Sequence, residues 1–113
     1  MTRRMPLLRG TLDLLILKTL SLAPNHGFGI VRILDESTEG VFFVEEGSLY
    51  PALHRLQKKG LVQSTWGVSE AGRRAKFYEL TKPGLDALRA ETDDWSLVSA
   101  SVAKVLALRP DPA

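Results

Sequence analysis

The chain has 113 residues, which is enough for one domain with a modest hydrophobic core. It contains no cysteine, which excludes a disulfide framework, a thiolate nucleophile and a zinc–cysteine site. Its formal net charge of +2 is unevenly distributed, because residues 54–82 alone hold seven basic and two acidic side chains, a net of +5. Such a concentration of positive charge favours a polyanionic partner.

The N-terminal part predicts a basic arm followed by a buried helix. Residues 1–9 contain three arginines, and we interpret them as a frayed arm. The dense apolar residues of 11–22 predict a helix buried on more than one side, with Thr11 as its cap and Asp13 near its N-terminal dipole. The apolar run at residues 14–17 is far too short to cross a membrane and carries no signal-peptide signature, so we expect a cytoplasmic protein with no membrane partner.

A second helix is predicted over residues 27–37, after a turn at residues 25–27. The chain has only two histidines, His26 and His54, which lie far apart in the sequence. We therefore expect no metal site, and we interpret His26 as a turn residue that bonds the backbone. We also expect no cofactor.

Residues 45–60 predict the helix around which the chain is organised. Leu49, Leu53 and Leu56 recur at helical spacing and form one apolar stripe, and we place Pro51 in the first turn, where a proline is tolerated. Side chains that donate hydrogen bonds occupy the other faces: Ser48, Tyr50, His54, Arg55, Lys58 and Lys59. Such a helix suits the major groove of DNA, although a solvated amphipathic helix has the same pattern.

The residues after this helix predict a β-hairpin. Residues 61–66 and 75–80 read as strands, and the glycine-bounded segment 67–72 connects them. The far side of the hairpin carries three cations: Arg73, Arg74 and Lys76. Three helices followed by such a hairpin is the order of a winged helix-turn-helix, a mainly α fold. In that fold the third helix enters the major groove, and the hairpin, called the wing, lies along the phosphates or reaches the adjacent minor groove.

Residues 82–106 predict one long helix, capped by Thr81 and with Pro83 in its first turn. At 1.5 Å per residue it is about 37 Å long, more than the core of a small domain requires, although a terminal helix that packs on its own domain stays an alternative. Its side chains recur every seven positions and predict a dimer seam, with Leu88, Trp95 and Val102 in one row and Leu85, Thr92, Ser99 and Leu106 in the other. Two arrangements stay open at Trp95: a packed pair of indoles, or a gap between subunits that suits a planar aromatic ligand.

Four segments resemble the PadR family of bacterial transcriptional regulators: residues 9–17 (RGTLDLLIL), 26–30 (HGFGI), 45–56 (EEGSLYPALHRL) and 72–78 (GRRAKFY). The match extends from Leu8 to about Leu106. The resemblance implies a winged-helix homodimer held by the C-terminal helix, which usually represses transcription from an inverted-repeat operator. Release by a small effector is common in the family. In the small-bodied branch that the short C-terminal part resembles, some members bind flat aromatic molecules beside a tryptophan that matches Trp95.

By the same matching, the resemblance implies that the DNA-binding residues are Ser48, Tyr50, Pro51, His54, Arg73, Arg74 and Lys76. We add Lys58, which lies with Lys59 toward the helix end, where contact with the DNA backbone or plain solvation is expected rather than base reading. Tyr50 would approach a thymine methyl group or a phosphate, and Ser48 a phosphate. We accordingly divide the chain into a DNA-binding domain at residues 1–81, a dimerisation helix at 82–107 and a tail at 108–113.

Two other classes of function compete with a DNA-binding repressor. A winged helix also serves as a protein-interaction module, but such a module does not require a local charge of +5. An enzyme is the weakest alternative, because the sequence holds no phosphate loop, no cysteine and no evident pair of catalytic carboxylates. We therefore expect no catalytic residue.

Overall fold

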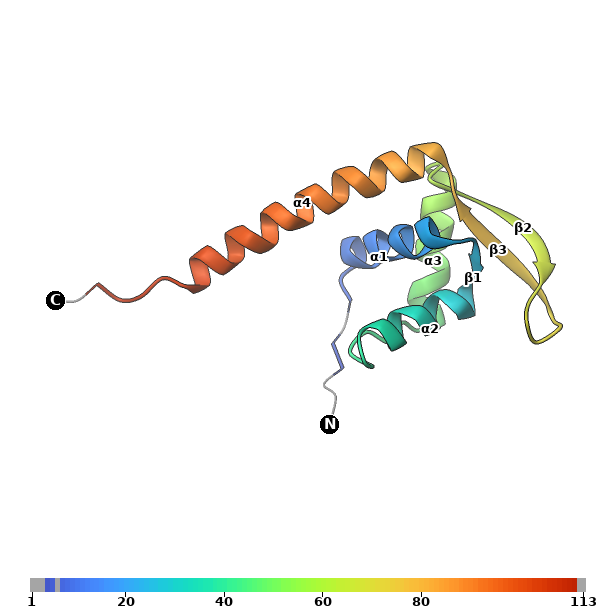
Figure 1. The fold of residues 1–113 in the computed structure, drawn as a ribbon, viewed down its shortest axis with the longest axis horizontal. Helices are drawn as coiled ribbons and strands as arrows, with labels where there is room; N and C mark the ends of the chain where they lie inside the picture. The colour runs from blue at the N-terminus through green and yellow to red at the C-terminus, as the bar shows by residue number, and fades with distance from the viewer. Residues whose placement is uncertain (1–3, 6, 112–113) are drawn as a thin grey trace.

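The computed structural model describes residues 4–5 and 7–111. Its helices and strands follow in the order α1 (Arg9–Leu22), β1 (Asn25–His26), α2 (Gly27–Ser37), α3 (Glu46–Lys58), β2 (Val62–Val68), β3 (Arg74–Leu80) and α4 (Lys82–Leu106). The first three helices form one body, with the β2–β3 hairpin at one end of the molecule and α4 projecting toward the other (Figure 1). This arrangement confirms the predicted mainly α winged helix-turn-helix.

The core of this body is a single cluster to which all three helices and the hairpin contribute. The largest fully buried side chains are Ile16, Leu17, Ile30, Leu49, Leu53, Leu56 and Val62. Helix α1 packs against α2, α3, α4 and β3, which confirms the prediction that its leucines are buried on more than one side. Burial of these side chains is the main stabilising contribution to the fold.

Helix α1 begins earlier than predicted. It starts at Arg9 after Leu8, whose side chain makes no capping hydrogen bond, so the prediction that Thr11 caps the helix is wrong. The N-terminal arm is also less loose than predicted, because the Met5 N–H donates to the Val41 carbonyl and the Arg4 guanidinium lies 4.8 Å from the centre of the Phe43 ring. Arg3 lies outside the described residues.

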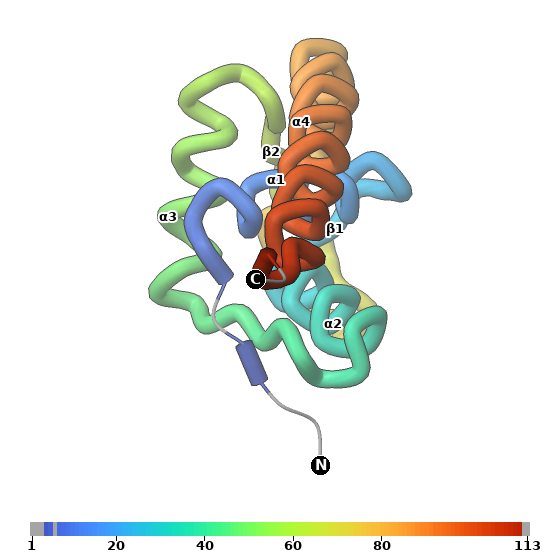
Figure 2. Tube along the Cα trace, turned by 90° about the vertical axis from the view of Figure 1, so that its left-hand side faces the viewer, coloured from blue at the N-terminus to red at the C-terminus, as the bar shows by residue number. Residues whose placement is uncertain are grey.

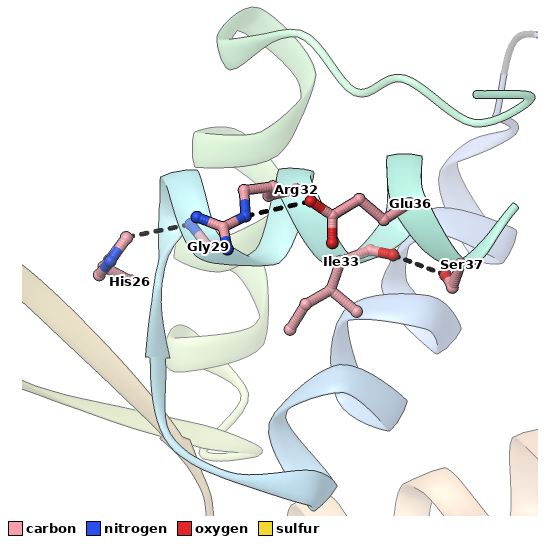
Figure 3. A network of polar contacts seen from close by, with 6 residues as sticks. All are labelled: His26, Gly29, Arg32, Ile33, Glu36 and Ser37. Atoms are coloured by element: carbon pink, nitrogen blue, oxygen red, sulfur yellow. Dashed lines mark hydrogen bonds and ion pairs between the residues drawn. The ribbon is translucent and has the colours of Figure 1, made fainter. Parts of the chain in front are cut away.

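Helix α2 has the predicted bounds because its start is fixed by a local cap. The His26 Nδ1 atom accepts a hydrogen bond from the Gly29 N–H at 3.0 Å, which confirms that His26 bonds the backbone (Figure 3). Further along the helix, an exposed Arg32–Glu36 ion pair spans one turn, and the Ser37 hydroxyl donates to the Ile33 carbonyl. The α2 N-terminus is therefore held in a defined position beside the hairpin.

The sheet has three strands in the order β1–β3–β2. Strands β2 and β3 are antiparallel, from the pair Val62↔Leu80 to the pair Val68↔Arg74, and both are longer than predicted. Strand β1 was not predicted, because two residues are too few for a sequence pattern. It pairs Asn25 with Tyr78 and His26 with Phe77 and so attaches the start of α2 to the hairpin.

Helix α4 has the predicted bounds and cap, since the Thr81 Oγ1 atom accepts a hydrogen bond from the Gly84 N–H at 3.1 Å. Only its first part packs on the domain, and every residue from 92 to 106 is exposed. Its C-terminal half extends beyond the other helices toward the viewer in Figure 2. The radius of gyration is accordingly 16.8 Å, larger than the roughly 13 Å of a compact chain of this length.

The structure corrects one end of the predicted dimer seam. Leu88 is only 7% exposed and belongs to the core of its own subunit, and Leu85 packs against that core. Leu88 is therefore packed within its own subunit, whereas Leu85 keeps part of its surface exposed. A heptad repeat cannot distinguish these two environments, because both place apolar residues at the same spacing.

An ion pair joins α1 and α3, and the carboxyl group of Glu91 on α4 lies in the same charged environment. The Arg55 Nη2 atom on α3 donates to Asp13 Oδ1 on α1 at 2.9 Å, so Arg55 does not point freely outward as predicted. Burial raises the pKa of Glu91 on α4, the Asp13 carboxylate raises it further, and Lys59 acts in the opposite direction. Among the described residues, the Glu91 Oε2 atom is buried without a hydrogen-bond partner.

We expect Glu91→Gln to stabilise the domain at neutral pH. Because the pKa of Glu91 is raised by folding, the unfolded chain loses this proton at lower pH than the folded chain. The free energy of unfolding should therefore fall as the pH rises from about 4 through the interval between the two pKa values, and Glu91→Gln should remove this fall. Thermal unfolding of the wild type and of Glu91→Gln across this pH range measures the fall in the free energy of unfolding. Identical pH profiles for the two proteins would contradict a raised pKa of Glu91.

Candidate nucleic-acid interface

Helix α3 presents one continuous exposed face. Leu49, Ala52, Leu53 and Leu56 are buried, which confirms the predicted apolar stripe. The opposite side carries the exposed residues Ser48, Tyr50, Pro51, His54 and Lys58. At 100° per residue, Ser48 and Tyr50 lie near opposite edges of this face, and Pro51, His54 and Lys58 lie between them. The residues predicted to face DNA therefore share one surface.

Pro51 does not lie in the first turn of α3, contrary to the prediction. The helix begins at Glu46, so Pro51 is its sixth residue and cannot donate a hydrogen bond to the Gly47 carbonyl. Gly47 is exposed, and a Cβ atom built on it would meet nothing within 4 Å. The N-terminal turn of α3 thus lies open to the surface at the point where a recognition helix reads bases.

Tyr50 is less free than its neighbours on this face. A Cβ atom added to Gly27 would lie 2.9 Å from the Tyr50 hydroxyl oxygen, so the tyrosine packs closely against the start of α2. The side chain is nevertheless 47% exposed. Tyr50 therefore connects the exposed face of α3 with the surface between α2 and the hairpin.

The hairpin carries one cation at the end of its turn and two on strand β3. Residues 69–73 connect the strands, with the Ser69 N–H donating to the Arg73 carbonyl at 2.8 Å and Gly72 in the left-handed region, at φ 77°. Arg73 ends this turn, whereas Arg74 and Lys76 stand two residues apart on one face of β3. All three side chains are exposed, as a phosphate contact requires.

Sequence patterns did not identify two aromatic residues near these cations. Trp66 on β2 is exposed and its ring lies 4.7 Å from the Arg74 guanidinium carbon, and Phe28 is exposed at the start of α2. The apolar pattern of residues 27–37 predicts that Phe28 lies on the buried face of the helix together with Ile30 and Leu34. This prediction is wrong, because Phe28 is 71% exposed. The sequence did hold a signal that Trp66 is exposed. Trp66 pairs with the charged Lys76 across the hairpin, so both side chains lie on the same face of the sheet.

The exposed part of α4 forms a second surface. Four of its large apolar residues are spaced three and four apart along one side of the helix: Trp95, Val98, Val102 and Val105. Leu97 and Leu106 are also exposed, outside this spacing. Val98 and Val105 were not in the predicted seam, whereas Thr92, Ser99 and Leu106, which were, lie beside this stripe. Between α4 and α1 there is an open hollow of about 630 Å³, and Leu14, Leu15, Thr92 and Trp95 contribute to its walls.

The described part of the chain holds neither a membrane-crossing helix nor a cluster of metal ligands. No helix in residues 4–5 and 7–111 combines the length and the apolar character that a membrane crossing requires. Within the same residues, no three histidine, aspartate or glutamate side chains gather closely enough to hold a metal ion.

Comparison with known proteins places these surfaces in a family context. Residues 16–90 match the model of the transcriptional regulator PadR-like family. A PadR-like transcriptional regulator from Bacillus cereus is 34% identical, with a TM-score of 0.77 and coverage of 89% of this chain and 96% of that one. A transcriptional regulator from Clostridium thermocellum is 28% identical, with a TM-score of 0.78 over 85% and 93% of the two chains. The transcriptional regulator YqjI of Escherichia coli is 29% identical over 93 residues, which are 82% of this chain but only 43% of YqjI.

Proposed function

Because the chain belongs to the PadR-like family of transcriptional regulators, whose members bind DNA and are not enzymes, we propose that it represses transcription as a homodimer on an inverted-repeat operator. The observation that carries this proposal is the shared exposure of one face of α3 and of the wing cations. In the proposed complex, Ser48, Tyr50, Pro51 and His54 face the major groove, and Lys58, near the end of α3, contacts the DNA backbone. Arg73, Arg74 and Lys76 contact phosphates. Bound to a promoter, the dimer excludes other proteins from that site.

The dimer is proposed to form through the exposed half of α4. Trp95, Val98, Val102 and Val105 make an apolar stripe in which each residue is at least half exposed. Apolar residues at this spacing pair readily with an identical helix, and a two-fold axis produces a self-complementary contact. Residues 1–81 then act as the DNA-binding unit and residues 82–107 as the dimerisation helix, with 108–113 as a tail. Two symmetry-related α3 helices would account for an inverted-repeat operator.

Salt dependence tests the DNA-binding mode. If each subunit neutralises about four phosphates, the plot of log K against log salt should have a slope of about −7 for the dimer on duplex DNA. Fluorescence anisotropy of a labelled duplex at several salt concentrations gives this slope. Affinity that does not change with salt would refute the proposed interface.

We expect the combined change Arg73→Ala and Arg74→Ala to weaken binding to operator and random duplex DNA alike, because phosphate contacts carry no sequence information. Since each subunit of this variant neutralises about two phosphates fewer, the salt slope should fall to about −4. Arg109→Ala, which removes a cation from the tail beyond α4, is the control and should keep the wild-type slope. Loss of operator binding alone would instead mean that the wing reads bases.

We further propose that a small planar aromatic effector releases the dimer from DNA by binding beside Trp95. Trp95 is 51% exposed in one subunit and lines the hollow between α1 and α4, whose walls also include the apolar Leu14 and Leu15. An indole and aliphatic walls suit a flat apolar ring. Regulation requires the effector to bind the DNA-free and DNA-bound dimers with different affinities.

Trp95→Ala is therefore expected to abolish effector-induced release. Because Trp95 also lies in the proposed dimer stripe, release is measured at a protein concentration that keeps this variant bound to the duplex. A panel of planar aromatic compounds is screened by Trp95 fluorescence in a Trp66→Phe background, which leaves one indole in the chain. Hits are then tested for release of labelled duplex from the wild-type protein and from Trp95→Ala. Fluorescence that stays unchanged across the panel would argue that Trp95 is simply packed in the dimer.

A further inference from the structure

One face of the hairpin carries large apolar and cationic side chains side by side. In the register of β2 and β3, Trp66 is opposite Lys76 and Val68 is opposite Arg74. Residues two apart along a strand share a face, so these four side chains lie on one side of the wing. Tyr78 continues the same face toward the body and is buried.

This face of the wing forms one wall of a hollow of about 560 Å³. Gly27 and Phe28 at the start of α2 and Tyr50 on α3 form the other walls. The side chains of Phe28 and Trp66 are 71% and 61% exposed. Arg74 and Lys76 contribute positive charge, and none of the residues that line the hollow is acidic.

The two cations of the hollow are held against aromatic rings. The Arg74 guanidinium carbon lies 4.7 Å from the centre of the Trp66 ring, and Lys76 Nζ lies 5.8 Å from that of Tyr78. A guanidinium over an indole keeps its N–H groups available in its own plane, where they can bond a phosphate in pairs. Contact with the ring also restricts an exposed side chain before binding, which lowers the entropy lost when the phosphate arrives.

We propose that this hollow is a seat for one strand of duplex DNA, in which Trp66 is a positioning residue that holds Arg74 for the phosphate and Phe28 packs against the adjacent sugar. The occupant is inferred from continuity, because Tyr50 belongs both to the hollow and to the exposed face of α3. A free phosphate would require only the cations. The exposed aromatic rings instead fit a DNA strand, in which charged phosphates alternate with apolar sugar surface. The inference rests on the proposed DNA-binding function and adds Trp66 and Phe28 to its contacts.

A double-mutant cycle on duplex binding tests the role of Trp66. Trp66→Val removes the ring but keeps a residue that favours strands, and Arg74→Ala removes the guanidinium. We expect Trp66→Val to weaken binding by about two- to fivefold in the wild type and by much less in the Arg74→Ala background. Trp66→Tyr, which keeps an aromatic ring, should retain most of the affinity that Trp66→Val loses. Val68→Ala, which changes an exposed neighbour on the same face, should have no effect on affinity.

Arg74→Lys provides a test that leaves the hairpin intact even if Trp66→Val does not fold. Lysine keeps the charge but lacks the plane that stacks on an indole, so affinity should fall several-fold while the salt slope is retained. Two results would contradict the proposed role of the hollow: wild-type affinity in Arg74→Lys, or an equal effect of Trp66→Val with and without Arg74. Both results are compatible with the proposed DNA-binding function. A wild-type protein that binds no duplex, or that binds polyglutamate equally well at the same salt, would overturn both the role of the hollow and the proposed function.

Discussion

Val102→Asp should convert the dimer into folded monomers. Val102 lies in the middle of the exposed apolar stripe of α4, so in the dimer each aspartate would be buried near its symmetry mate. A buried charge without a partner costs several kcal/mol, and two such charges should raise the dimer dissociation constant by orders of magnitude. Operator affinity should fall with it by at least about 100-fold, because each monomer contacts only one half-site.

Ala100→Asp is the matched control for this experiment. Ala100 is exposed on the same helix, but at 100° per residue it lies on the side opposite the stripe. It adds the same charge at a site that the proposed dimer leaves open to water, so its sedimentation coefficient should be that of the wild-type dimer. Dimerisation of Val102→Asp at wild-type affinity would refute the proposed seam.

Leu88→Asp should have a different outcome, namely unfolding of the domain itself. Leu88 is buried in the core that α1 and α4 share, and an aspartate there would remove this packing and leave an unpaired charge. The expected cost of several kcal/mol is a large part of the roughly 5–15 kcal/mol that stabilises a domain. Circular dichroism should therefore show a reduced helix signal or a large decrease in melting temperature.

Leu97→Asp is the control for Leu88→Asp. Leu97 is an exposed leucine on the same helix, so the same substitution should leave the melting temperature of the domain nearly unchanged. A folded, monomeric Leu88→Asp protein would mean that Leu88 belongs to the subunit contact after all.

Elements with local signals were predictable from the sequence. The bounds of α2 and α4 depend on caps within three residues of their starts, at His26 and Thr81, and both were predicted correctly. The start of α1 was not, because Leu8 offers no capping side chain and Thr11, a favourable cap, lies inside the helix. Strand β1 depends wholly on pairing with β3, which no local pattern encodes.

In the candidate interface, too, features with local signals were predictable and features that depend on distant contacts were not. The exposed face of α3 follows from helical periodicity and was predicted. The Asp13–Arg55 ion pair joins residues that are 42 positions apart, and the placement of Leu88 in its own core requires knowing how α4 crosses α1. The hollow at the wing needs α2, α3 and the hairpin to meet, so the role proposed for Trp66 and Phe28 could be inferred only from the fold.

Selection of bound sequences from a pool of random duplex DNA tests the central claim most directly. A homodimer with two α3 helices related by a two-fold axis should enrich an inverted repeat, with half-sites centred about one helical turn apart, roughly 10 base pairs, or a multiple of it. The wild-type protein should enrich this repeat, and Val102→Asp should enrich at most a single half-site. A wild-type pool that remains random, or that converges on an unsymmetrical sequence, would contradict a dimeric operator-binding repressor.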